Sequence, residues 1–178
     1  KPSSKSKVKP LITNLLILSI LASVMLVAVY ATDTPRGAET TSAIYNGNQN
    51  CGKVAFMFNV YENTETALNI AKLLVEHGFC ATFFVGGKWV ERNPNALLSL
   101  YNMGMEIGNH GYLHRDHRLL SLQKNVDEIL LTERLVDAHL KAFPNYANSK
   151  LFAPPSGSVG EDMFSACDNL GYKVIMWT

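Results

Sequence analysis

The sequence has little excess charge of either sign and few cysteines, and each shortage excludes a class of protein. Sixteen Lys and Arg against 15 Asp and Glu leave a net charge of +1. This excludes the strongly basic character typical of nucleic-acid-binding domains, so we expect no nucleic-acid partner. Three cysteines, Cys51, Cys80 and Cys167, have no Cys-x-x-Cys spacing and fit neither a disulfide framework nor a zinc knuckle. We expect Cys80 and Cys167 to pack as small apolar side chains, and one disulfide stays possible.

A stretch without any charge stands near the start of the chain. Residues 11–31 contain no Asp, Glu, Lys or Arg, and a helix of that length can span a bilayer. Four lysines lie within residues 1–10, so the positive-inside rule places this short segment in the cytoplasm and the rest of the chain outside. We predict an uncleaved membrane anchor. A signal peptide cleaved near Ala31 would equally export the domain, and a buried core helix is the third alternative.

After this stretch the chain changes character twice. Residues 32–50 lack apolar periodicity and are rich in Gly, Thr, Ser and Asn, which predicts a flexible linker. From residue 51 to residue 178, short apolar runs alternate with helical periodicity. We predict strands over 53–60, 79–86, 105–110, 150–155 and 172–178, and helices over 63–78, 93–104, 121–143 and 160–171. The helix over 121–143 is expected to turn Val126, Ile129, Leu130, Leu135 and Leu140 toward one side.

Strands that alternate with helices indicate an α/β fold with parallel strands, either a doubly wound sheet or a (β/α) barrel. In both folds the chemistry lies at the carboxyl ends of the strands. The loops after residues 60, 110 and 153 are therefore expected to meet at one mouth. Because the last apolar run reaches Thr178 with no helix to cover it, we expect the natural domain to continue beyond this residue.

The loop that follows the third predicted strand carries three histidines within ten residues, in the sequence GNHGYLHRDH. His110 and His114 stand four residues apart, a spacing that lets two imidazoles reach one cation. His117 lies three residues further along. The alternative interpretation is that these are surface histidines beside Arg115 and Asp116.

Three separated motifs resemble those of the polysaccharide deacetylases of carbohydrate esterase family 4, over about Lys53 to Thr178. They are CATFFVGGKWVERNP at 80–94, MEIGNHGYLH at 105–114 and LFAPPSG at 151–157. The resemblance implies a distorted (β/α) barrel and metal-dependent removal of acetyl groups from chitin-like sugars or peptidoglycan. It assigns a divalent metal to His110 and His114, with zinc favoured by the imidazole ligands. It assigns the substrate groove to Pro154, Pro155, Ser156 and Gly157.

The chain departs from the family pattern at its first motif. Where the family has TFDDG, with a catalytic base and a third metal ligand, this chain has MFNVY at 57–61. Asn59 stands at the position of the base and Val60 at that of the ligand, and neither side chain performs that role. Ala153 replaces the arginine that pairs with the base. These features, together with APPSG, resemble a branch of the family associated with spore formers.

A rebuilt site would need a carboxylate, and Glu62, Glu65 and Asp116 are the candidates, although Glu65 also suits the first turn of a helix. Two functions therefore stay open. The first is an exported, membrane-anchored hydrolase that removes N-acetyl groups from acetylated polysaccharide. The second is an inactive family member that binds cell-wall glycan. A third interpretation, in which the histidines are surface residues of a spacer domain, predicts no metal.

Overall fold

The computed structural model describes residues 8–32 and 42–177. The chain divides into two compact units, residues 1–39 and residues 40–178. The first contains the helix α1 (Val8–Thr32), which covers the predicted anchor. Among the residues that the structure describes, no helix is both long and apolar enough to cross a membrane. The anchor over 11–31 stays a prediction.

The second unit alternates strands and helices along the chain, as the sequence predicts. Its strands are β1 (Met57–Val60), β2 (Thr82–Val85), β3 (Glu106–Asn109), β4 (Leu151–Phe152) and β5 (Lys173–Val174). Its α-helices are α2 (Thr64–Glu76), α3 (Gly87–Arg92), α4 (Pro94–Asn102), α5 (Leu122–Leu140) and α6 (Glu161–Leu170). Two short 3-10 helices, η2 (His117–Leu119) and η3 (Pro155–Gly157), lie in the loops after β3 and β4.

The five described strands form one parallel sheet in the order β1-β2-β3-β4-β5. Each strand thus lies beside the next one in the chain. A doubly wound sheet reverses its strand order at a switch point, whereas a (β/α) barrel adds its strands in sequence. The α/β class with a parallel sheet is confirmed. The strand order favours the barrel alternative, and closure of the barrel stays a prediction.

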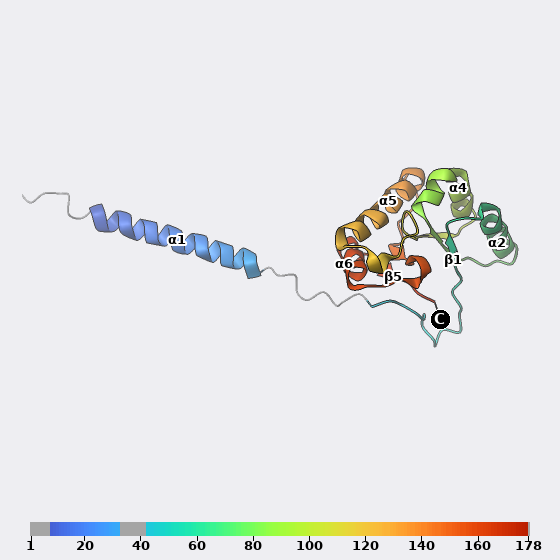
Figure 1. The fold of residues 1–178 in the computed structure, drawn as a ribbon, viewed down its shortest axis with the longest axis horizontal. Coiled ribbons are helices and arrows are strands. Elements are labelled where there is room, and N and C mark those ends of the chain that lie inside the picture. The colour runs from blue at the N-terminus through green and yellow to red at the C-terminus, as the bar shows by residue number, and fades with distance from the viewer. Residues whose placement is uncertain (1–7, 33–41, 178) are drawn as a thin grey trace, which may run out of the picture. The chain divides into compact units, whose positions relative to one another are not determined.

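Helices pack against the sheet (Figure 1), and two hydrophobic clusters join them to it. The larger combines apolar side chains of β1, β2 and β3 with those of α2 to α5, and includes Phe83, Trp89, Leu97 and Leu100. The smaller joins β4, β5 and α6 to Ile129 of α5. The strand termini next to the three predicted loops are therefore anchored in a close-packed core.

The structure differs from the sequence-based expectation in several elements, and its strands are shorter than predicted, with β4 and β5 of two residues each. β1 begins at Met57 rather than at Lys53, since only residues 57–60 have partners in β2. The helix α3 was not expected. Ile44, inside the predicted linker, instead forms a parallel bridge with Ile175, donating its N–H to the carbonyl of Val174 at 2.8 Å.

The buried face of α5 also differs from the expected one. Its buried residues are Asn125, Glu128, Ile129, Thr132, Val136 and Leu140. Of the residues expected on that side, Ile129 and Leu140 are buried, whereas Val126, Leu130 and Leu135 are half-buried. The apolar pattern did not predict the polar residues, which make up half of the buried face. Polar side chains on a buried face need internal hydrogen-bond partners.

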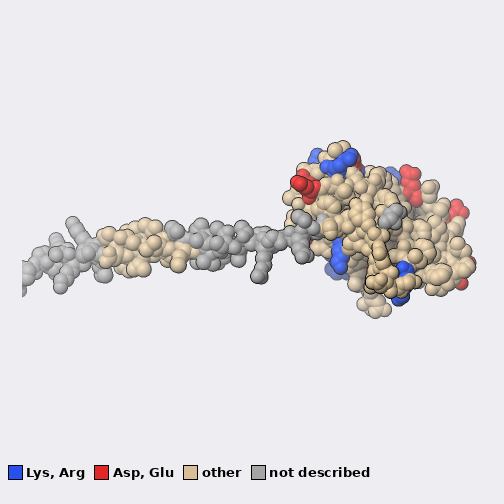
Figure 2. Space-filling view, turned by 90° about the horizontal axis from the view of Figure 1, so that it is seen from below, with Lys and Arg blue, Asp and Glu red and all other residues tan. Residues whose placement is uncertain are grey.

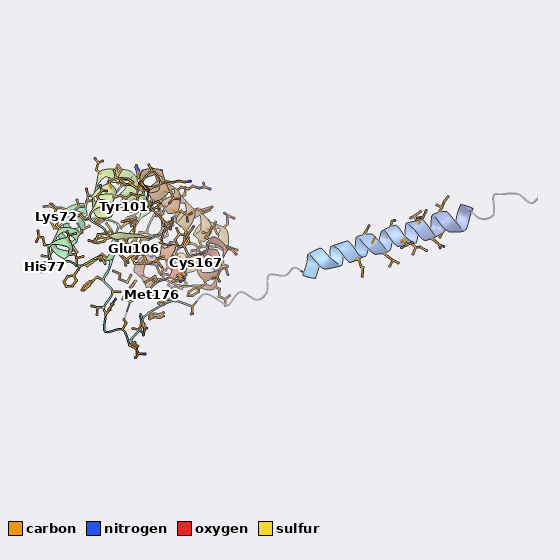
Figure 3. The ribbon with its side chains drawn as sticks, turned by 180° about the vertical axis from the view of Figure 1, so that it is seen from behind. Lys72, His77, Tyr101, Glu106, Cys167 and Met176 are labelled. Carbon is orange, nitrogen blue, oxygen red and sulfur yellow. The ribbon has the colours of Figure 1, made fainter. Side chains whose placement is uncertain are left out.

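All three cysteines are free, and only one of them is buried. Cys167 lies inside α6 (Figure 3), where burial raises the pKa of its thiol to about 12. Cys80 is exposed, so its expected apolar packing is wrong. The cause is its position two residues before β2, outside the strand that enters the core.

On the face shown in Figure 2, charged side chains of both signs are scattered singly over the domain.

Candidate functional site

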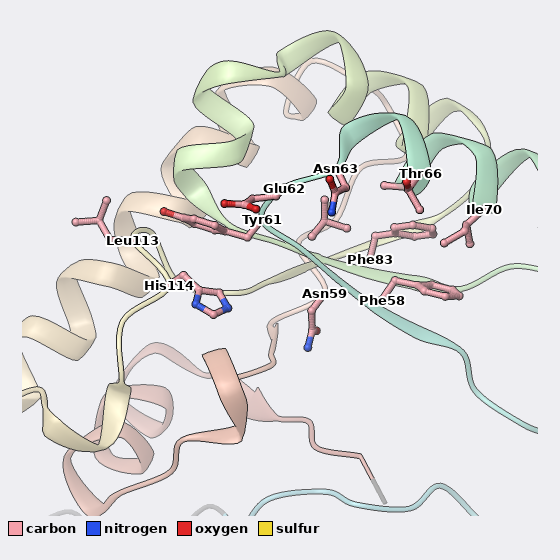
Figure 4. Close-up of a pocket in the computed structure, with 12 residues that line it drawn as sticks. Phe58, Asn59, Tyr61, Glu62, Asn63, Thr66, Ile70, Phe83, Leu113 and His114 are labelled. Carbon is pink, nitrogen blue, oxygen red and sulfur yellow. The ribbon is translucent and has the colours of Figure 1, made fainter.

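A groove of about 700 Å³ opens at the carboxyl end of β1 (Figure 4). It is lined by residues of the loop after β1 and of the histidine loop, together with apolar residues of α2 and β2. Its polar end is formed by Asn59, Tyr61, Glu62, Asn63 and His114. The expected meeting of the first and third loops is therefore observed. Pro154, Pro155, Ser156 and Gly157, which the resemblance assigns to the substrate groove, do not line this one.

His110 follows β3 directly and is 2 % exposed. Its Nδ1 donates a hydrogen bond to the carbonyl of Ala153 at 2.7 Å, which leaves Nε2 as the nitrogen with an available lone pair. Burial lowers the pKa of His110 to about 4. The side chain is therefore neutral at physiological pH, the form in which imidazole accepts a hydrogen bond or binds a cation.

His114 lies at the surface with its ring between those of His110 and Tyr61. The centroids are 5.2 Å apart for His110 and His114, and 5.1 Å apart for His114 and Tyr61. Its backbone has a φ of 53°, in the left-handed region that a residue with a side chain rarely adopts. Tyr61 in turn lies against Gly86, where the space for a Cβ is taken by the Tyr61 ring. Glycine at position 86 thus allows Tyr61 to reach His114.

The first strand brings Asn59 and Val60 to the same groove. Asn59 is exposed, and Val60 is 3 % exposed at the end of β1. Of the candidate acids, the exposed Glu62 lines the groove beside them. Glu65 lies in the first turn of α2 and does not line it. Glu62 is therefore the only one of these two carboxylates that the fold brings to Asn59 and His114.

Asp116 connects the histidine loop to the loop after β4, which contains Ser158. It accepts hydrogen bonds from the Ser158 hydroxyl and the Arg118 N–H, and pairs with the Arg118 guanidinium at 3.1 Å. The bond from Ser158, followed by the charge of Arg118, lowers the pKa of Asp116. A carboxylate held in this way fixes two loops against each other and is poorly suited to accept a proton from water.

His117 is completely buried, and its ring has a fixed tautomer. The amide nitrogen of Asn125 donates to the carbonyls of His117, Leu120 and Ser121, so the Asn125 oxygen accepts from Nδ1 of His117 at 2.7 Å. Nε2 of His117 has no hydrogen-bond partner among the described residues. A Cβ added at Gly111 would lie 2.7 Å from this nitrogen. His117 thus packs beneath the loop and does not face the groove.

The described residues fit a divalent metal only in part. His110 offers a neutral nitrogen, and its ring lies close to that of His114. At the position that the resemblance assigns to the third ligand, this chain has the aliphatic Val60. Within the part of the chain that the structure describes, no three His, Cys, Asp or Glu side chains are grouped to hold a metal ion. Two histidines are fewer than the three protein ligands of catalytic zinc sites, so these residues do not fit a resident catalytic metal.

Sequence reasoning missed two residues of this region, Tyr61 and Glu128. Tyr61 immediately follows β1, and its position at a strand end was the available signal. Glu128 is buried in α5 and binds the backbone of the histidine loop. Its signal was helical spacing, since Glu128 shares a helix face with Asn125 and Thr132.

The fold and the site together define the class of protein. It is an α/β domain whose parallel strands carry a histidine pair and an adjoining groove at their carboxyl ends. Residues 46–175 match the sequence pattern of the family described as polysaccharide deacetylase. The chain belongs to the polysaccharide deacetylase family.

Relatives within this family include named deacetylases and a pseudoenzyme. The chain is 32 % identical to the uncharacterized protein YlxY of Bacillus subtilis over 76 % of its own length and 41 % of that protein. It is 28 % identical to a peptidoglycan-N-acetylglucosamine deacetylase of Bacillus cereus, covering 75 % of this chain and 47 % of the relative. The structure of BA3943, a pseudoenzyme of the CE4 family from Bacillus anthracis, matches with a TM-score of 0.72 and 31 % identity over 78 % of this chain and 47 % of that one. The chain thus spans about half the length of these relatives, or less.

Proposed function

We propose that this chain is a non-hydrolysing member of the polysaccharide deacetylase family that binds acetylated cell-wall glycan of the peptidoglycan type. The observation that carries the proposal is that Asn59 and Val60, which stand where the family motif has two acids, line a groove that His114 also borders. An amide cannot take the proton of an attacking water near pH 7. The relatives named as peptidoglycan deacetylases support the class of ligand, and the pseudoenzyme relative supports the absence of turnover.

The groove offers the groups that an acetylated sugar needs for binding. An N-acetyl group presents one N–H donor and one carbonyl acceptor. Asn59 can serve both with its amide, and His114 and the Tyr61 hydroxyl can each donate or accept. The aromatic ring of Tyr61 adds an apolar surface beside these polar groups. Binding therefore needs neither a metal nor a catalytic base.

Export is part of the proposal and rests on the N-terminal sequence. Four lysines precede an uncharged stretch over 11–31, as in membrane anchors and signal peptides. We place the domain outside the cytoplasm, held at the cell membrane by a single span, with secretion after signal cleavage as the alternative. This is the compartment in which cell-wall glycan is accessible.

Sedimentation with insoluble peptidoglycan tests the proposed binding, with acetate release measured in the same samples. We expect the protein to sediment with acetylated peptidoglycan and to release acetate only at the rate of the protein-free control. His114→Ala should weaken sedimentation roughly tenfold, the effect of one or two lost polar contacts. His77→Ala is the matched control, because His77 is exposed on the end of α2 (Figure 3). Acetate release above background would contradict the absence of turnover.

A second candidate function is hydrolysis by a rebuilt site, and one observation favours it. Glu62 lines the same groove as Asn59 and His114, so its carboxylate could accept the proton of an attacking water. If acetate is released, Glu62→Gln is expected to lower the rate roughly 100-fold or more, the usual contribution of a general base. Glu65→Gln is the control, because Glu65 does not line the groove. Equal rates for both variants would exclude Glu62 as the base.

A further inference from the structure

One buried carboxylate holds the backbone of the histidine loop just before His114. Glu128 of α5 is 6 % exposed. Its Oε2 accepts the N–H of Tyr112 at 2.8 Å and the N–H of Leu113 at 2.7 Å. Hydrogen bonds to a charged acceptor are stronger than those between neutral groups. Without this oxygen, two backbone donors of the loop would lose their partner.

The same carboxylate also holds the loop after His114. Its Oε1 lies 3.4 Å from Nε of Arg115. Glu128 therefore contacts the two residues before His114 and the one after it. It is the one side chain for which the structure gives contacts on both sides of this histidine within the described chain.

The opposite edge of the loop is bonded to α3. The carbonyls of Gly111 and Tyr112 accept the N–H groups of Gly87 and Lys88 at 2.9 and 3.0 Å. Gly87 has no room for a side chain, because a Cβ there would lie 2.6 Å from the Tyr112 ring. The N–H groups of Tyr112 and Leu113 thus bind α5, and the carbonyls of Gly111 and Tyr112 bind α3. Of these two sets of contacts, only the one with α5 depends on a side chain.

His114 itself needs such support. Its left-handed φ of 53° is unfavourable for a residue with a Cβ, and such conformations persist only where the surroundings enforce them. The ring is exposed, and its contacts are with the Tyr61 and His110 rings. These contacts depend on the backbone conformation that the loop imposes at position 114.

We propose that Glu128 is a positioning residue that holds His114 in its left-handed conformation and its ring against Tyr61 and His110. Glu128 does not line the groove, so it acts through the loop. The geometric part of this proposal is independent of what the groove binds. Its consequence for glycan affinity rests on the proposed function.

Nuclear magnetic resonance of Glu128→Gln and Glu128→Ala tests this role. In the wild type, we expect the Tyr61 and His110 rings to shift the His114 ring protons away from the positions of an exposed histidine, and the Tyr112 and Leu113 amides to exchange slowly. Glutamine keeps one oxygen acceptor but cannot pair with Arg115, and alanine keeps neither. We expect exchange of both amides to rise about tenfold in the glutamine variant and further in the alanine variant, since one hydrogen bond corresponds to about that factor. The His114 ring protons should move in the same order toward the exposed positions.

Glu133→Gln is the matched control. Glu133 lies on the same helix and binds Lys150 and the Tyr172 hydroxyl instead of the loop. This variant should leave the His114 ring protons and the two amides unchanged. A folded Glu128→Ala protein with wild-type ring shifts and exchange rates would overturn the proposal. If the alanine variant does not fold, unchanged shifts and rates in Glu128→Gln would overturn it.

Glycan binding tests separately whether Glu128 affects the affinity of the groove. Glu128→Ala should weaken sedimentation with peptidoglycan about as much as His114→Ala does, roughly tenfold, and Glu128→Gln should restore part of it. Failure of the wild type to bind glycan would contradict the proposed function, while the ring shifts and amide exchange would still decide the role of Glu128. Wild-type glycan affinity in a Glu128→Ala protein with displaced His114 resonances would overturn the link between the loop and the groove.

Discussion

Val60→Asp is expected to raise the zinc affinity of the protein by roughly 100-fold or more, because it adds a third ligand to a pair of histidines. Val60 ends β1 and lines the groove with His114. His110 already presents a neutral imidazole whose Nδ1 is bonded to Ala153. The missing component is an anionic oxygen at position 60. Isothermal titration of wild type and variant with zinc measures the change.

Val60→Asn is the control for this prediction. Asparagine has nearly the shape of aspartate but lacks its charge and is a weak zinc ligand. We expect its zinc affinity to stay near that of the wild type, and the gain of Val60→Asp to disappear when His114→Ala is added. Equal zinc affinity in the Asp and Asn variants would show that position 60 does not face the same cation as the histidines.

A cost in stability should accompany the gain in metal affinity. Val60 is 3 % exposed, and a carboxylate buried there without a partner is destabilising. Zinc binds the folded variant and therefore offsets that loss by an amount that rises with the logarithm of the zinc concentration. Thermal unfolding of Val60→Asp should thus depend strongly on zinc, whereas that of the wild type should depend on it little.

The alternation of strands and helices was the part of the fold that the sequence predicted best. Runs such as residues 79–86 and helices such as 63–78 have clear periods, and β2 and α2 lie inside those ranges. α3 was missed because a six-residue helix that itself begins with a glycine has too few turns to show a period. The start of β1 was misplaced because strand bounds depend on the partner strand, here β2.

The residues that border the groove were predictable, and those that hold the histidine loop were not. Asn59 lies in the last half of β1, while Glu62, His110 and His114 come after strands, and parallel strands bring their carboxyl ends together. The histidine loop depends on contacts distant in sequence, from Glu128 in α5 and from the backbone of α3. Such contacts leave little trace in a local pattern. A buried acid on a helix face is their only sign, and it can be interpreted only once the neighbouring loop is known.

Acid is expected to destabilise the protein through His110. Burial lowers the pKa of His110 to about 4 from its ordinary value of 6.5. Between pH 6.5 and 4, His110 therefore binds a proton in the unfolded chain but stays neutral in the folded chain. This favours unfolding as the pH falls through that range, while above pH 6.5 the residue imposes no such cost. We expect a loss of about 3 kcal/mol of folding free energy near pH 4 relative to pH 7 from this residue.

Urea unfolding of wild type and His110→Gln at pH 7, 5.5 and 4 measures this loss. Glutamine can donate to the Ala153 carbonyl and does not titrate, so the stability difference between the two proteins should shift in favour of the variant as the pH falls. Carboxylate titration affects both proteins alike and cancels in the difference. Burial also lowers the pKa of His117. Both proteins should therefore keep some sensitivity of their stability to acid. His77→Gln, at an exposed position, should follow the wild type at every pH. If the stability of His110→Gln falls with pH as much as that of the wild type, the folded protein accepts a proton on His110 without cost. His110 would then not be held neutral by burial, which the zinc prediction also requires.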